Sequence, residues 1–419
     1  MTRSPATLSL NGRSYKAPSR PTVVICADGC DPAYIARGLA DGILPRIARL
    51  REEGFLGTAE AVMPSFTNPN NLSIVTGAPP SVHGISGNYH LDRASGAEVM
   101  MTDESFLRSE TIPALFSQRG VKTAVVTAKD KLRRLLKKGL EGIAFSSECA
   151  NSAEERLVGR ERPGIYSADL SLFVLDAGIR LLEKGEAQLF YLSLSDYVEH
   201  AFPPGGGQAD AFLSALDSRI GRFVELGAVV GLVADHGMND KARADGSANV
   251  IFLEDALCRR FGAQSARVIC PITDPFVRHH GALGSFVRVY VKDLSRSSAM
   301  MAASSALPGV AVVLEGSEAA RRFELPPDRE ADFVVIGDRS TVLGSAASKH
   351  DLAGLAGARL RSHGGLGELS VPFLISRPLT ASYRERAEKG GQTESQKDSQ
   401  KQRLRNFDIF DFALNGIEG

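Results

Sequence analysis

The chain has no tryptophan and few cysteines for its 419 residues. The cysteines are odd in number and scattered: Cys26, Cys30, Cys149, Cys258 and Cys270. This argues against a disulfide framework and favours reduced thiols in the cytoplasm. The chain also lacks a window of about 20 uncharged apolar residues, which a membrane span requires, and residues 1–16 lack the apolar centre of a signal peptide. We therefore expect a cytoplasmic protein that does not enter a membrane.

An excess of one charge is missing too, because Lys plus Arg and Asp plus Glu number 49 each. This balance gives no support to a nucleic acid or an anionic membrane surface as a partner. A small molecule is therefore the expected partner. The oligomeric state is not readable from the sequence, so a homodimer stays open.

Apolar, β-branched runs alternate with helix-length amphipathic segments in the first 240 or so residues. The alternation is typical of a mostly parallel sheet covered by helices on both faces. A helix is expected near residues 44–51, and residues 64–88, rich in Gly, Pro and Asn, predict a loop with a short helix. The predicted strands are Thr22 to Ala27, Thr123 to Thr127, Gln188 to Leu194 and Val229 to Ala234.

The pattern changes after Gly237. Residues 243–345 contain short β-like runs, such as VIFL, SFVRVYV and DFVVIG, without strong helix–strand alternation. We expect this region to be an inserted cap, with 1–242 and 346–419 forming the core. VPFLIS predicts a further core strand, and NFDIFDFALN predicts a closing amphipathic helix. Residues 380–403 are too polar to pack and predict a solvated loop or a weak helix.

Four widely separated segments carry Asp or His where an apolar run ends. The residues are Asp28, Asp196 with His200, Asp235 with His236, and His363. In open α/β sheets ligands bind outside the carboxyl ends of the strands, which is where the three aspartates and Lys129 are expected. A single Asp in such a place is most often a helix cap, but the whole set with its histidines favours metal ligands.

The spacing of the pair Asp196 and His200 strengthens the metal interpretation. If a helical turn begins at Asp196, both side chains project to one side and can hold one ion. Mixed Asp and His ligation suits Zn²⁺ or Mn²⁺ better than Ca²⁺ or Mg²⁺. The ligand types do not decide between Zn²⁺, Mn²⁺ and Fe²⁺.

With these motifs the chain resembles the alkaline phosphatase superfamily. The resemblance covers nearly the whole chain, through ADGCDP, MPSFTNPNN, GISGNYH, TAKDKLRRLL, SLSDYVEH, ADHGMNDK, HHGALGSF, RSHGG and NFDIFDFALN. It implies an alkaline-phosphatase-like α/β core with a mostly parallel sheet, an inserted α+β cap and a site for two zinc ions. TAKDK and HHGALGSF indicate the branch that cleaves C–P bonds.

The resemblance also implies roles for individual residues. It gives one zinc ion to Asp28, Thr67, Asp235 and His236, and the other to Asp196, His200 and His363. Thr67 would be the nucleophile, because a divalent cation lowers the pKa of a coordinated hydroxyl.

Substrate contacts are implied in the same way. Asn88 in GNYH would donate its amide to a phosphonyl oxygen, and His200 and His363 would also lie against the substrate. Lys129 and Lys131 match substrate-binding lysines; the alternative is a solvated basic surface, since four further basic residues follow within KLRRLLKK.

The implied reaction is hydrolysis of phosphonoacetate to acetate and phosphate. Cleavage of a C–P bond expels a carbanion, which is a poor leaving group unless a carboxyl group delocalises the charge, so a cation beside that carboxylate is useful. The expected steps are attack by Thr67 on phosphorus, departure of acetate, and hydrolysis of the phosphothreonine.

Two alternatives stay open. A phosphodiesterase or nucleotide pyrophosphatase would use the same metal ligands but would need an apolar or aromatic pocket for a nucleotide base. The absence of tryptophan disfavours such a pocket. A phosphonate-binding protein without turnover is the other alternative.

The remaining histidines are not expected to bind metal. His279 and His280 are expected to line the closed site or to pack between cap and core, and His83, His90 and His350 are expected to be structural.

Overall fold

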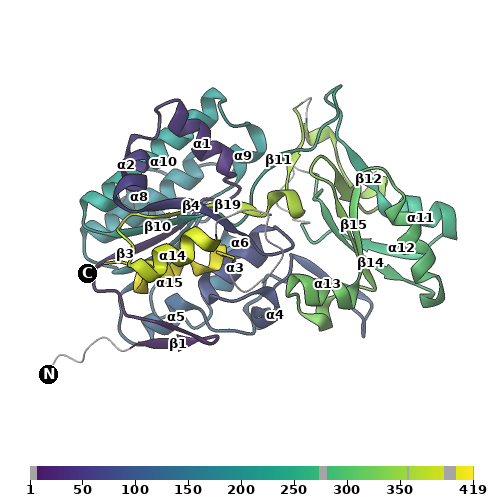
Figure 1. The fold of residues 1–419 in the computed structure, drawn as a ribbon, viewed down its shortest axis with the longest axis horizontal. Helices are drawn as coiled ribbons and strands as arrows, with labels where there is room; N and C mark the ends of the chain where they lie inside the picture. Colours follow the sequence, from purple (N-terminus) through teal and green to yellow (C-terminus); the bar gives the residue numbers. More distant parts are fainter. Residues whose placement is uncertain (1–6, 273–280, 356–357, 391–402, 419) are drawn as a thin grey trace.

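The computed structural model of the chain describes residues 7–272, 281–355, 358–390 and 403–418. It has two parts, a larger one built on a seven-stranded sheet and a smaller one built on a four-stranded sheet (Figure 1). All five cysteines are free thiols, as predicted. Among the described residues, no helix has the length and apolarity to span a membrane.

The central sheet of the larger part has the order β4-β19-β10-β3-β9-β7-β8. Its strands are β4 (Phe55–Glu60), β19 (Ser370–Ile375), β10 (Val229–Val233), β3 (Thr22–Cys26), β9 (Leu189–Ser193), β7 (Thr123–Thr127) and β8 (Ile143–Ser146). The strands from β10 to β8 are parallel, and β19 and β4 form an antiparallel edge. The four strands predicted in the first 240 residues are confirmed, and VPFLIS lies in β19.

Helices cover both faces of this sheet, as the uninterrupted apolar strands require. Figure 1 places α1 (Pro32–Ala40), α2 (Pro45–Glu53), α8 (Asp169–Glu183) and α10 (Gly207–Glu225) on one side of the sheet, and α5 (Ile112–Ser117) and α15 (Ile409–Asn415) on the other. The helix predicted near residues 44–51 is α2, which buries Ile47 and Leu50. The closing helix is α15, which buries Ile409 and Phe410. Both predictions are confirmed.

Residues 64–88 are more helical than expected. They contain α3 (Thr67–Thr76), whose residues after Thr67 are all buried, and α4 (Pro80–His83). Helix α3 was not predicted at its full length because its sequence contains a proline and several asparagines, and Asn side chains usually favour turns. Here they bond to the backbone instead: Asn70 accepts from the Val62 amide at 2.7 Å and donates to the Phe66 carbonyl at 3.1 Å. Residues 380–403 include α14 (Ala381–Gly390), and 391–402 lie outside the described residues.

The smaller part is formed between residues 250 and 344. An antiparallel sheet holds β13 (Ala266–Ile269), β14 (Phe286–Val291), β16 (Phe333–Gly337) and β15 (Val310–Glu315), and β12 (Val250–Phe252) pairs with β17 (Val342–Gly344). Its side chains form a second hydrophobic cluster, which includes Phe286 and Phe333 and which Met63 and Phe66 of the larger part join.

The β-like runs of this region are strands, as predicted, but the expected lack of helix–strand alternation is wrong. The helices α11 (Leu253–Phe261), α12 (Ser297–Ser305) and α13 (Gly316–Phe323) lie between the strands. Each of these helices has only eight or nine residues, so the short apolar strands beside them dominate the sequence pattern. The cap limits at residues 243 and 345 stay a prediction.

Candidate metal centre

Three aspartates lie where adjacent parallel strands end. Asp28 follows β3, Asp196 follows β9 and Asp235 follows β10, and all three are buried. Because β9, β3 and β10 are neighbours in the sheet, residues far apart in the chain meet at one edge. This is the carboxyl-terminal edge, where ligands bind in open α/β sheets.

The aspartates form two groups with three histidines. One group is Asp28, Asp235 and His236, and the other is Asp196, His200 and His363. In each group one ligand atom per residue lies within 4.8 Å of the others, and every member is buried. The groups adjoin, since the His236 and His363 rings stack with centroids 3.6 Å apart. Each group has the composition of a metal site.

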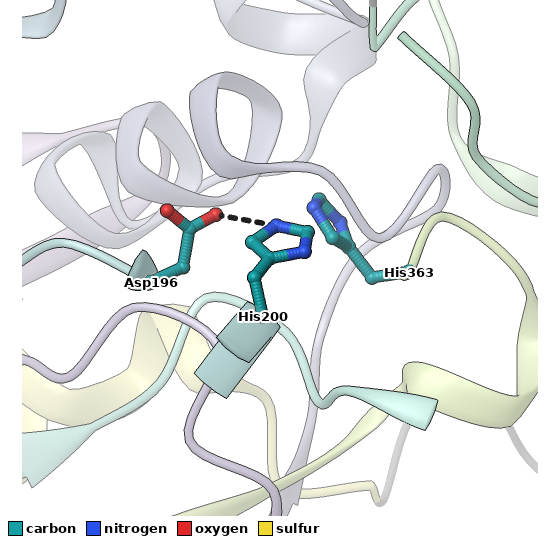
Figure 2. A group of neighbouring side chains, drawn as sticks. All are labelled: Asp196, His200 and His363. Carbon is teal, nitrogen blue, oxygen red and sulfur yellow. Dashed lines mark ion pairs between the residues drawn. The ribbon is translucent and has the colours of Figure 1, made fainter. Parts of the chain in front are cut away.

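The second group is drawn in Figure 2. Helix α9 (Tyr197–Ala201) begins directly after Asp196, so Asp196 and His200 project to one side, with His200 Nε2 3.2 Å from Asp196 Oδ2. The helical turn expected from their spacing is therefore present. His363 reaches the same place from a distant segment and faces the His200 ring at a centroid distance of 5.4 Å.

All three histidines are held through Nδ1 by a backbone carbonyl. His200 bonds to the Arg361 carbonyl at 2.8 Å, His236 to the Gly237 carbonyl at 3.0 Å and His363 to the Ser65 carbonyl at 2.8 Å. A carbonyl oxygen only accepts, so each Nδ1 carries the proton and Nε2 faces the aspartates. This orientation is the one that metal ligation through Nε2 requires.

Three carboxylates are buried together in this site. Burial raises the pKa of Asp235, and the nearby Asp28 raises it further. Burial lowers the pKa of His236, but Asp235 and Asp28 outweigh that effect and raise it to about 9. Buried carboxylates at such close range need cations. The mixed carboxylate and imidazole donors therefore fit divalent ions of the zinc type.

Lys129 lies between the two groups. Its Nζ donates to Asp28 Oδ2 at 3.1 Å and to Asp196 Oδ1 at 2.7 Å. Burial lowers its pKa, but Asp196 and Asp28 outweigh burial and raise it, so the side chain is charged. The sequence placed Lys129 at the end of β7 but did not predict its contacts with two of the candidate metal ligands.

Thr67 and the expected substrate residues other than His200 line a cavity of about 30 Å³. Thr67 is the first residue of α3, and its Oγ1 lies 3.3 Å from His236 Nε2. The positive end of the α3 helix dipole therefore faces the cavity, which favours a bound anion. The cavity is lined by Phe66, Thr67, Asn68, Asn88, Lys129, Lys131, Leu132, Asp196, Ile272 and His363.

Two asparagines that follow Thr67 hold these residues in place. Asn71 donates to Asp235 Oδ2 at 3.0 Å, and its Oδ1 accepts from the Tyr191 and Ser193 hydroxyls at 2.7 and 2.8 Å. Asn68 donates to Asn88 Oδ1 at 2.8 Å. Neither asparagine was predicted from the sequence as part of the site; the signal available was the repetition of Asn directly after the candidate nucleophile.

Replacing Asn71 by Leu is expected to weaken zinc binding by about 10- to 100-fold, because Asp235 loses the donor that orients it. The zinc dissociation constant, measured by competition with a chromophoric chelator, checks this. Ser193→Ala is the matched control, since it removes a bond to Asn71 but leaves the bond from Asn71 to Asp235. Equal zinc affinities for Asn71→Leu and the native chain would contradict the role.

Gly29 lets two of the metal-ligand segments approach each other. Its φ is +74°, and a Cβ there would lie 3.1 Å from the Cβ atoms of both Asp196 and Glu199. Its amide donates to Asp235 Oδ1 at 3.2 Å. A side chain at this position would therefore separate Asp28 from Asp196.

The histidines expected to be structural lie outside both ligand groups. The His350 Nδ1 bonds to the Gly281 carbonyl at 2.8 Å, and His90 packs edge-on to Phe106. His83 is buried, with Nε2 2.9 Å from the Ser73 hydroxyl. His279 and His280 lie outside the described residues.

His83 is expected to make stability depend on pH. Burial and Arg329 lower its pKa from 6.5 to about 3, so the folded chain does not bind the proton that the unfolded chain binds below 6.5. The contribution of His83 to the free energy of unfolding is therefore present above pH 6.5 and is lost as the pH falls. The loss is about 2 kcal/mol between pH 7 and pH 5. Urea unfolding should show this loss in the native chain relative to His83→Gln; parallel pH profiles for the two would contradict it.

A second cavity of about 180 Å³ adjoins the first through Lys129, Lys131 and Asp196. Its other walls include Ile165, Tyr166 and Tyr197, and the two tyrosine rings lie 6.1 Å apart. An aromatic slot therefore exists beside the site without tryptophan. The missing tryptophan therefore does not exclude aromatic side chains beside the site, because the fold brings together tyrosines that are distant in the chain.

The chain belongs to the type I phosphodiesterase / nucleotide pyrophosphatase family, whose model matches residues 22–365. Within this class it is similar to phosphonoacetate hydrolase from Sinorhizobium meliloti, whose structure has been determined with phosphonoformate and with phosphonoacetate. The identity is 44%, 98% of this chain and 99% of the other are covered, and the TM-scores are 0.89 and 0.88. Murine ectonucleotide pyrophosphatase / phosphodiesterase 5 is similar in fold, with 16% identity, a TM-score of 0.62 and 94% of each chain covered.

Proposed function

We propose that this chain hydrolyses the C–P bond of phosphonoacetate to give acetate and phosphate. The observation that carries the proposal is the small cavity in which Thr67, Asn88, Lys129 and Lys131 meet beside two buried ligand groups. It offers a nucleophile, an amide donor and two cations for a substrate with a phosphonyl group and a carboxylate. The similarity to a phosphonoacetate hydrolase over nearly the whole chain supports the choice of substrate.

Two zinc ions belong to the proposal. Asp28, Asp235 and His236 would hold one together with Thr67, and Asp196, His200 and His363 would hold the other. Bound zinc would lower the pKa of the Thr67 hydroxyl and neutralise charge on the phosphonyl oxygens.

The chain's own residues then account for the reaction. Thr67 Oγ1 passes its proton to solvent water and bonds to phosphorus as the P–C bond breaks, and the electron pair of that bond passes to the methylene carbon. The neighbouring carboxylate delocalises the pair in an enolate-like form beside the lysines, until water protonates the carbon to acetate. The hydroxide left by that water takes up the proton that Thr67 released. A second water cleaves the phosphothreonine to phosphate and restores Thr67. Asn88 donates to a phosphonyl oxygen throughout.

Lys131 is expected to bind the substrate carboxylate. A hydrogen bond between charged groups contributes about 1.5–3 kcal/mol, so Lys131→Ala should lower kcat/KM for phosphonoacetate about 10- to 100-fold. The loss should nearly vanish for p-nitrophenyl phosphate, which has no carboxylate. Steady-state kinetics on both substrates measures this difference.

Lys137→Ala is the matched control, because Lys137 belongs to the same basic stretch but is exposed. If Lys131→Ala and Lys137→Ala have the same small effect, the lysines form a solvated surface and the carboxylate contact is wrong.

The second cavity favours one other candidate function. Its tyrosines would accept an aromatic group attached to the phosphoryl group, as in a nucleotide phosphodiester, with attack by Thr67 unchanged. Direct comparison of a phosphonate and a diester as substrates separates the two functions.

A further inference from the structure

We propose that Arg288, a buried residue of β14 in the smaller part, positions Asn88 at the substrate cavity by holding the backbone of Ser86. It would act as a positioning residue and does not touch the substrate. The inference rests on the proposed function, because it takes Asn88 as the donor to the phosphonyl or phosphoryl oxygen.

Arg288 joins the two parts of the molecule. Its Nε and Nη2 donate to the two carboxylate oxygens of Glu330 at 2.7 and 3.1 Å. The same Nη2 reaches Ser86, with 3.2 Å to the carbonyl oxygen and 3.1 Å to the hydroxyl. The Arg288 side chain is fully buried, so water does not compete for these hydrogen bonds.

Stability alone does not explain an arginine here. Its strand, FVRVYV, is otherwise apolar and buried, and a buried ion pair is often no more stabilising than apolar side chains of the same size. What an apolar residue could not supply is the donor to Ser86. The ion pair with Glu330 keeps the guanidinium charged and fixed in direction while it makes that contact.

The segment from Ser86 to Asn88 is seated on the smaller part. The Asn88 amide donates to the Pro271 carbonyl at 2.7 Å, and its side-chain Nδ2 lies 3.3 Å from the Ile272 carbonyl. A Cβ at Gly87 would lie 2.5 Å from the Pro271 Cβ, so only glycine allows this approach. Arg288 supplies the charged anchor at the start of this segment.

From the larger part, Asn68 donates to Asn88 Oδ1. The amide that lines the cavity is therefore oriented by both parts, through Asn68 on one side and through Arg288 and Pro271 on the other. A displacement of about 1 Å in a positioned group can lower the rate about 100-fold. Loss of the contact to Ser86 should accordingly act on catalysis through Asn88.

The test is a double-mutant cycle with Asn88. The pair Arg288→Met and Glu330→Gln removes both charges together, so that no buried charge is left alone. In the native chain the Glu330 carboxylate accepts a hydrogen bond from the Ala331 amide at 3.0 Å. The side-chain amide oxygen introduced by Glu330→Gln would still accept this hydrogen bond. We expect the pair to lower kcat/KM about 10-fold in the native background. In the Asn88→Ala background the same pair of substitutions should change kcat/KM less than about twofold, because the side-chain amide that Arg288 positions is absent.

The control is the pair Arg219→Met and Asp176→Asn, which removes another two-bond ion pair, between α10 and α8. It should leave kcat/KM within about twofold in both backgrounds. Thermal unfolding of every variant excludes loss of the fold. If the Arg288 pair lowers kcat/KM equally with and without Asn88, or does not lower it at all, the inference is overturned.

Binding of inorganic phosphate to the zinc-loaded protein, followed by calorimetry, gives a readout that does not depend on the choice of substrate. The cycle should show the same coupling in the dissociation constant. If the Arg288 pair and Asn88 are coupled in phosphate binding but phosphonoacetate is not turned over, the proposed function is rejected and the inference is kept. If phosphonoacetate is turned over but the two are not coupled, the inference is rejected and the proposed function is kept.

Discussion

Thr67→Ala is expected to lower kcat by about 10⁴-fold, since loss of a nucleophile removes the covalent route and leaves only binding and electrostatic effects. The structure supports the role because Thr67 begins α3, lines the small cavity and lies 3.3 Å from His236. Steady-state turnover of the zinc-loaded variant measures the loss.

Thr67→Ser is the matched control, because it keeps the hydroxyl and removes only a methyl group. It should retain a large share of the activity and form a phosphorylated protein, detectable by mass spectrometry after rapid acid quenching. Near-full turnover by the zinc-loaded Thr67→Ala variant would exclude a covalent intermediate on this residue.

Removal of metal is the second large effect. A chelator should abolish turnover, and Zn²⁺ should restore it, because the two buried ligand groups need cations to offset their carboxylates. Asp235→Ala and His363→Ala should each bind one zinc ion fewer than the native chain, as measured by elemental analysis.

Zinc should also raise the unfolding temperature of the native chain, since it binds the folded state. Asn249→Ala serves as the control and should keep the native metal content, because the Asn249 side chain lies just before β12 and bonds to Ser340 and Thr341, not to either ligand group. Undiminished turnover by chelated protein that contains no metal would contradict the assignment of both groups.

The sequence predicted the arrangement of the core for a physical reason. The strands β3, β7, β9 and β10 are buried on both faces, so their apolar runs are unbroken and each ends visibly at a polar residue. Parallel strands align their carboxyl ends, and the Asp residues that follow β3, β9 and β10 therefore meet. Asp196, His200 and His363 lie together in the structure, and their role as ligands of one metal ion stays a prediction.

What the sequence did not reveal depends on contacts between distant segments. The bond of Asn71 to Asp235 and the contact of Arg288 with Ser86 join residues that no local pattern connects. The tyrosine-lined cavity arises in the same way. Lys129 shows the limit most clearly, because its place at a strand end was predicted but its contacts with Asp28 and Asp196 required the relative positions of three strands.

The most direct test of the proposed function is the steady-state turnover of the zinc-loaded protein on phosphonoacetate beside p-nitrophenyl thymidine monophosphate, with phosphate and nitrophenol release measured in parallel. We expect a large preference in kcat/KM for phosphonoacetate, which Lys131→Ala reduces. A preference for the diester would keep the fold, the metal ligands and Thr67, but it would contradict C–P bond hydrolysis and assign the tyrosine-lined cavity to the substrate.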